Sequence, residues 1–94
     1  MELGRVVGQV VSTVRDLGLP NLTFLLVDIV DAKGNVTFPN QVAADTIGAG
    51  EGEVVLLVRG SSARLILEGK RPLDLSVIGI VDQISSGKEA IYQK

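Results

Sequence analysis

The apolar residues of the chain fall into short runs with a period of two, which is the pattern of β-strands. Over Leu3–Val14 both alternating faces are rich in valine or leucine, and one face also carries two glycines. Leu22–Val30 is likewise apolar on both faces. These runs predict the first two strands, and the first is long enough to bend at its glycines.

Turn-forming residues separate the runs. Residues 15–21 contain Gly and Pro and are expected to form a loop. Asp31–Asn35 has the composition of a hairpin turn, because Asp can accept hydrogen bonds from the backbone that follows it and Gly can take a left-handed conformation. A third strand is expected from Val36, interrupted at Pro39-Asn40 and resumed over Val42–Asp45, since Pro suits an edge or a bulge.

The most distinctive pattern is the segment Asp45–Arg64, DTIGAGEGEVVLLVRGSSAR. A loop with three glycines leads into Glu53–Arg59, a fourth strand that is apolar without polar alternation. A strand apolar on both faces must be covered on both faces. A chain of 94 residues leaves little protein for the second cover, so we expect that face to meet another copy of the chain.

The end of the chain adds one helix and one strand. A short helix is expected from Ser61 or Ser62, which can cap it, through about Leu67. The last strand is expected over about Leu73–Ile84, followed by a polar C-terminal tail of residues 85–94. Five strands with one short helix before the last strand predict an all-β fold, a small, partly open, OB-like β-barrel.

Composition narrows the chemistry. The chain has no cysteine and no histidine, which excludes disulfides, thiolate and imidazole catalysis, and the usual zinc sites. Apolar residues make up 46% and aromatic residues 3%, so the core must be aliphatic, and this apolar content in so small a chain favours oligomerisation. A net charge of −2 with scattered basic residues argues against nucleic-acid and anionic-membrane partners. With no signal peptide or long apolar helix in the pattern, we expect a cytoplasmic protein.

The glycine-rich loop is one candidate binding site. A phosphate-binding loop needs Lys and then Ser or Thr after the glycines and a helix to follow, whereas two glutamates and a strand follow here. We therefore interpret the loop as structural. Its residues are Gly48, Ala49, Gly50, Glu51 and Gly52.

Serine and aspartate residues are the other candidates. Ser61 and Ser62 have no histidine to activate them, so they are interpreted as helix caps, and Arg64 as a residue that binds a carboxylate or carbonyl across a subunit contact. The aspartates match no calcium-binding spacing. Asp28 and Asp82 interrupt apolar strands and must be solvated or paired, with a structural hydrogen bond favoured over catalysis. No catalytic, cofactor-binding or metal-binding residue is predicted, and we expect no enzyme.

Four segments resemble one family over nearly the whole chain, namely the bacterial microcompartment vertex proteins of the EutN/CcmL type. They are RVVGQVVSTVRD, FLLVDIVDAKGN, VAADTIGAGEGEVVLLVRGSSAR and RPLDLSVIGIVDQI. The resemblance implies that residues 1–84 form a single vertex-protein barrel domain. It also implies a homopentamer at the fivefold corners of a carboxysome or metabolosome shell, beside hexameric or trimeric shell proteins.

Two site expectations follow from such a ring. Residues Gly48 to Gly52 are expected near the fivefold axis, because glycines let five backbones converge. Ser61, Ser62, Arg64 and Asp82 are expected at the subunit interface. The alternative function is an OB-fold module that binds nucleic acid or oligosaccharide, but such a module needs exposed aromatic residues and a basic groove.

Overall fold

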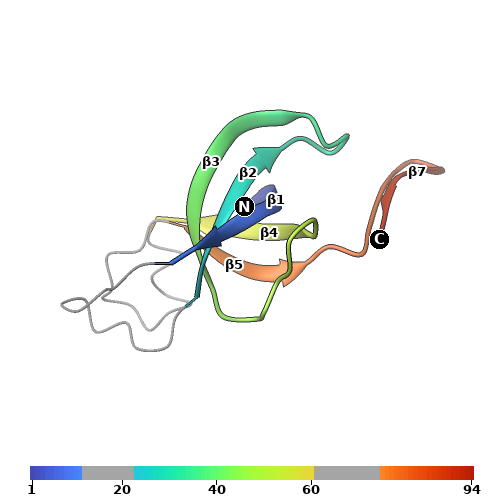
Figure 1. The fold of residues 1–94 in the computed structure, drawn as a ribbon. Helices are drawn as coiled ribbons and strands as arrows, with labels where there is room; N and C mark the ends of the chain where they lie inside the picture. The colour runs from blue at the N-terminus through green and yellow to red at the C-terminus, as the bar shows by residue number, and fades with distance from the viewer. Residues whose placement is uncertain (12–22, 61–74) are drawn as a thin grey trace.

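The structure, a computed structural model, describes residues 1–11, 23–60 and 75–94, and in these residues it is all-β (Figure 1). Five strands form a barrel, and two more form a separate hairpin at the C-terminus. The strands are β1 (Glu2–Val10), β2 (Thr23–Val30), β3 (Val36–Asp45), β4 (Val54–Arg59), β5 (Leu75–Ile80), β6 (Gln83–Ser86) and β7 (Glu89–Gln93).

The barrel is closed, with the strand order β1-β2-β3-β5-β4. All neighbouring strands are antiparallel except β3 and β5, which are parallel and pair, among the described residues, at Ala44 with Ser76 and at Asp45 with Val77. This confirms the predicted all-β, five-stranded barrel, although the barrel is closed rather than partly open. The expected helix from Ser61 or Ser62 to Leu67 lies outside the described residues.

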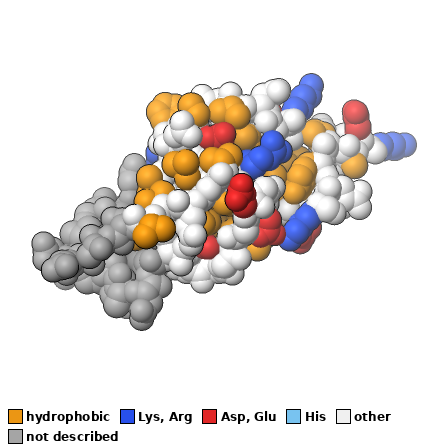
Figure 2. Space-filling model, in the orientation of Figure 1, with side chains coloured by type: hydrophobic (Ala, Val, Ile, Leu, Met, Phe, Trp, Pro, Cys, Tyr) orange, Lys and Arg blue, Asp and Glu red, His pale blue; other side chains and the backbone are white. Residues whose placement is uncertain are grey.

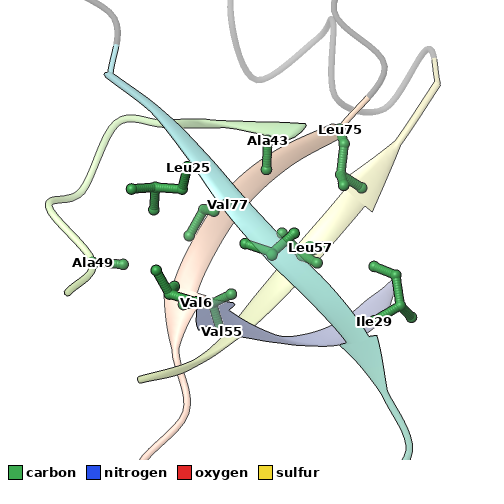
Figure 3. Close-up of a cluster of buried hydrophobic side chains, with 10 residues drawn as sticks. Val6, Leu25, Ile29, Ala43, Ala49, Val55, Leu57, Leu75 and Val77 are labelled. Atoms are coloured by element: carbon green, nitrogen blue, oxygen red, sulfur yellow. The ribbon is translucent and has the colours of Figure 1, made fainter. Parts of the chain in front are cut away.

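The core is aliphatic, as the composition requires. One parity of each barrel strand points inward, so that alternate residues of β1, β2, β4 and β5 meet in the interior (Figure 3). Burying such side chains contributes about 25 cal/mol per Å² of apolar surface. The core residues are Val6, Leu25, Val27, Ile29, Ala43, Ala49, Val55, Leu57, Leu75 and Val77.

A bulge, and not a break, accounts for Pro39-Asn40. Strand β3 is continuous, but its register with β2 shifts on both sides of Ile29. Asn40 takes a φ of 58°, and its N–H donates to Asp28 Oδ1 at 2.9 Å. The prediction that Asp28 would make a structural hydrogen bond is therefore confirmed. The bond stabilises the left-handed backbone conformation of Asn40 at the bulge.

The outer face of β4 is covered in part within the chain. Val54 and Val58, on the face opposite the barrel core, are buried, whereas Leu56 between them is half-buried. Val54 lines a small cavity with Ile84, Ile91 and Tyr92, so the C-terminal hairpin covers one end of this face. The expectation that this face meets another copy of the chain stays a prediction.

The last strand is shorter than predicted. It ends at Ile80 instead of Ile84. A further strand, β6, begins at Gln83 and runs into the expected polar tail, which also contains β7, and the turn between them includes Gly87 with a φ of 63°. Asp82 therefore lies in the exposed link between β5 and β6, not inside an apolar strand. Within the described ranges, no helix has the length and apolar character needed to cross a membrane.

Candidate functional site

The glycine-rich loop after β3 is organised by the carboxylate of Asp45. Asp45 is only 6% exposed and accepts three backbone hydrogen bonds from the loop that follows it. Ile47 and Gly48 donate to Oδ1 at 3.0 and 3.2 Å, and Ala49 donates to Oδ2 at 2.8 Å. The carboxylate thus occupies the position at which the N–H groups of the loop would bind an anion. Its own negative charge would also repel an anionic ligand.

A second carboxylate holds the far side of the loop. Glu53 Oε1 accepts the N–H of Gly50 at 2.6 Å, and Glu53 Oε2 lies 2.6 Å from Lys94 Nζ near the C-terminus. The Lys94 ammonium, and then the Gly50 N–H, hold the pKa of Glu53 below its ordinary value. In turn Glu53 raises the pKa of Lys94. The loop is therefore tied to the end of the chain through one exposed ion pair.

The three glycines have different roles. Gly48 and Gly52 take φ values of 83° and 88°, which side chains with a Cβ rarely adopt. Gly50 has no positive φ, but a Cβ there would lie 3.3 Å from Glu53 Oε1. The backbone of Gly52 also donates to the carbonyl of Val6 at 2.8 Å, which fixes the loop against β1.

Ala49 and Glu51 point in opposite senses. Ala49 is buried in the barrel core beside residues of β1 and β2, as Figure 3 shows. Glu51 is exposed at the turn of the loop. The loop therefore closes one part of the barrel with its alanine and presents a negative side chain to the outside.

This geometry does not suit phosphate binding or metal binding. The N–H groups of residues 47–50 already donate to two carboxylates, so a phosphate would have to displace bonds and meet like charge. In the part of the chain that the structure describes, no group of three or more acidic, histidine or cysteine side chains is placed to hold a metal ion. The structural interpretation of the loop agrees with these contacts.

Three exposed large apolar side chains lie on β3. Phe38 is 57% exposed, and Val36 and Val42 are each 52% exposed. Figure 2 shows hydrophobic side chains at several places on one face of the molecule, including the side where β3 lies. In the described residues β5 pairs with the last two residues of β3, and no described strand occupies the second edge of β3 before Ala44. Proteins rarely leave such an edge unprotected.

The residues expected at a subunit interface are only partly placed. Ser61, Ser62 and Arg64 lie outside the described residues. Asp82 is exposed, and its carbonyl accepts the N–H of Lys94 at 2.8 Å. Sequence reasoning missed Asp45 as the centre of the loop, although an Asp two to four residues before a Gly-rich turn is a known signal for side-chain-to-backbone bonds.

Comparison with known proteins gives matches over the whole chain. A family model described as "Ethanolamine utilisation protein EutN/carboxysome" matches residues 1–82. The bacterial microcompartment shell vertex protein EutN of Escherichia coli K12 is 50% identical over 95 residues, covering 100% of both chains. The carboxysome shell vertex protein CcmL of Gloeobacter violaceus is 42% identical over 95 residues, covering 100% of this chain and 95% of the relative.

One similar solved structure is described as a pentamer. The GrpN pentameric microcompartment shell protein from Rhodospirillum rubrum is 40% identical and superposes with a TM-score of 0.80. The match covers 92% of this chain and 100% of that one.

Proposed function

Because the chain belongs to the EutN/CcmL family, we propose that it is a structural shell protein whose pentamers cap the fivefold vertices of a bacterial microcompartment. The observation that carries the proposal is the end-to-end match to two shell vertex proteins, combined with a barrel that superposes on a pentameric shell protein. The resemblance seen in the sequence pointed to the same family.

A ring of identical subunits fits the surfaces of the chain. A cyclic pentamer is built head to tail, so each subunit needs two different patches that complement each other. The exposed apolar residues of β3 supply one surface whose burial is favourable at about 25 cal/mol per Å². At a shell corner, a fivefold unit supplies the curvature that flat hexagonal tiles lack. The partners in this proposal are hexameric or trimeric shell proteins, and the location is the shell in the cytoplasm.

The glycine-rich loop is proposed to line the fivefold axis. Two observations support this position, namely the exposed Glu51 at its turn and the absence of side chains at Gly48 and Gly52, where five backbones could approach. Five copies of Glu51 would repel, but exposed charges are screened over about 8 Å at physiological ionic strength. The opening would then have a negative rim and pass only small solutes.

The subunit interface is proposed to include Ser61, Ser62, Arg64 and Asp82. Asp82 has the exposure that such a role requires, and Arg64 has the fork geometry that suits a carboxylate. The function is proposed to be non-enzymatic, because the two carboxylates that flank the loop, Asp45 and Glu53, accept hydrogen bonds from its backbone. We propose no cofactor.

Native mass spectrometry of the purified chain tests the proposal. We expect a species of five chains that persists at micromolar concentration and does not change the electrophoretic mobility of single-stranded DNA. A monomer that binds DNA would refute the vertex function and favour an OB-fold binding module.

In cells, deletion of the gene should leave the facets of the shell intact but its corners without vertex pentamers. Electron micrographs should then show elongated or leaky compartments. Normal closed polyhedra in a strain without a second vertex protein would count against it.

A further inference from the structure

A small cavity lies where the barrel, the turn between β2 and β3 and the C-terminal hairpin meet. Its volume is about 30 Å³, which is room for about two water molecules. Its apolar wall includes Val30 and Val54 of the barrel and Ile84 and Ile91 of the hairpin. Its polar groups come from one arginine, one lysine, one aspartate and one tyrosine.

The arginine, Arg5, is half-buried and held in place beside this cavity. Its side chain leaves β1 on the outer face of the barrel, because the next residue, Val6, points into the core. The guanidinium lies against the turn, since a Cβ at Gly34 would be 3.2 Å from Arg5 Nη2 and 3.8 Å from Nη1. Among the described residues the guanidinium has no hydrogen bond and no ion pair. A cation that is partly withdrawn from water is stabilised by an anionic partner.

The two carboxylates near Arg5 are engaged elsewhere. Asp28 lies opposite Arg5 in the register of β1 and β2, but its Oδ1 accepts the N–H of Asn40 at the bulge of β3. Asp31 lines the cavity, but its two oxygens accept three hydrogen bonds from residues of its own turn. Neither carboxylate therefore pairs with the guanidinium, and the donors of Arg5 are available to a ligand.

Two more polar groups line the same cavity. Lys33 is exposed at its rim and Tyr92 is half-buried in its wall. The Lys33 ammonium and the Tyr92 hydroxyl make no hydrogen bond to any residue that the structure describes. Arg5 and Lys33 against Asp31 leave the lining with one net positive charge. A monoanion would balance that charge, and the apolar wall would strengthen the attraction because it lowers the local dielectric.

We propose that this cavity binds the carboxylate group of a small organic acid, with Arg5 donating to both carboxylate oxygens. Arginine binds carboxylates in this bidentate way with good geometry and strength. A volume of about two water molecules suits the two oxygens of a carboxylate and is too small for a tetrahedral sulfate or phosphate group. The rest of the acid extends into solvent beside exposed Ala32. Because the site lies within one chain, it does not depend on the proposed pentamer.

Tyrosine fluorescence tests the site directly, because Tyr92 is the only tyrosine and the chain has no tryptophan. The probe is sodium acetate, titrated into the whole protein with sodium chloride keeping the ionic strength constant. We expect a saturable change with a Kd on the order of millimolar, as two charge-assisted hydrogen bonds partly exposed to water allow. Sodium sulfate at the same ionic strength should give no saturable change.

Substitutions identify the groups that bind. Arg5→Gln should raise the Kd for acetate by about tenfold or more, as loss of a charge-assisted pair does. Arg5→Lys should weaken binding less, because the charge remains while the planar fork is lost. Lys33→Gln changes an exposed side chain, keeps the fold and should also raise the Kd. The matched control is Arg59→Gln, which removes an exposed arginine that pairs with Glu2 and should leave the titration unchanged.

The outcomes separate a built site from general effects of salt. A fluorescence change that grows linearly with acetate, as collisional quenching does, would overturn the proposal. Equal losses in Arg5→Gln and Arg59→Gln would also overturn it, because the effect would then follow total charge. Tighter binding of sulfate than of acetate would overturn the assignment to carboxylates. Each of these results would leave the vertex function untouched, since native mass spectrometry tests that function separately.

Discussion

Replacing Asp45 by Asn should loosen the glycine-rich loop and destabilise the barrel. The carboxylate accepts three N–H groups at 2.8–3.2 Å, two on Oδ1 and one on Oδ2. An amide of the same shape can present one oxygen only, so its NH₂ group must face at least one of the N–H donors. The bond from Ala49 is buried, whereas the other two are only partly buried.

The burial of these bonds sets the expected magnitude. An unsatisfied buried N–H costs about 1–3 kcal/mol, and a partly exposed bond that water can replace costs about 0.5–1 kcal/mol. The amide loses either the one buried bond or the two partly buried bonds, so the free energy of unfolding should fall by about 1–3 kcal/mol. For a domain of this size that is a fall in melting temperature of about 5–20 °C.

The assay is thermal unfolding at one fixed subunit concentration, because assembly makes the midpoint depend on concentration. Amide hydrogen exchange should also accelerate at Ala49. Asp31→Asn is the matched control, since Asp31 likewise accepts three hydrogen bonds, from Lys33 N, Asn35 N and Asn35 Nδ2, but at an exposed turn. Its melting temperature should barely change. Equal losses at the two aspartates would refute the reasoning that burial decides the cost.

Further predictions concern close packing and pH. A Cβ at Gly4 would lie 2.6 Å from a buried leucine of β4, so Gly4→Ala should cost about 1–3 kcal/mol in urea unfolding. Gly8→Ala, whose Cβ would lie 3.8 Å from its nearest neighbour, should cost less than that, and equal costs would refute the clash. The Lys94 ammonium and then the Gly50 N–H lower the pKa of Glu53 from 4.5, so the bond that holds Gly50 should persist above that pH and weaken as the pH falls through the lowered pKa. The protection of the Gly50 amide, measured against its intrinsic exchange rate at each pH, should follow this titration, and Glu53→Gln should remove that step in protection.

Local patterns were sufficient for most of the barrel. Short apolar runs predicted β2 and β4 to within one residue at each end, because strand formation there depends on apolar side chains and on the turn residues beside them. The turn at Asp31 was predicted with its mechanism, since its hydrogen bonds are made to residues two and four positions later. Such short-range bonds can be read from neighbouring letters of the sequence.

Long-range effects were not predictable in the same way. The cover of Val54 comes from the C-terminal hairpin, some thirty or more residues later, and no period in β4 indicates it. The hairpin itself had a signal, a Gly between two short segments with Ile84 and Tyr92, but its polar composition resembled a tail. The interface residues Ser61, Ser62 and Arg64 remain predictions, because a contact between copies depends on a second surface that a single chain does not contain.

The buried side chain of Ala49 limits which positions of the glycine-rich loop can change without loss of the fold. Ala49 is constrained by its place in the core, and Gly48 and Gly52 are constrained by their left-handed backbone. Glu51 alone combines an exposed side chain with an ordinary backbone. Selection or an engineer could therefore reset the charge presented by this loop, from negative to neutral or positive, by changing one codon without disturbing the fold.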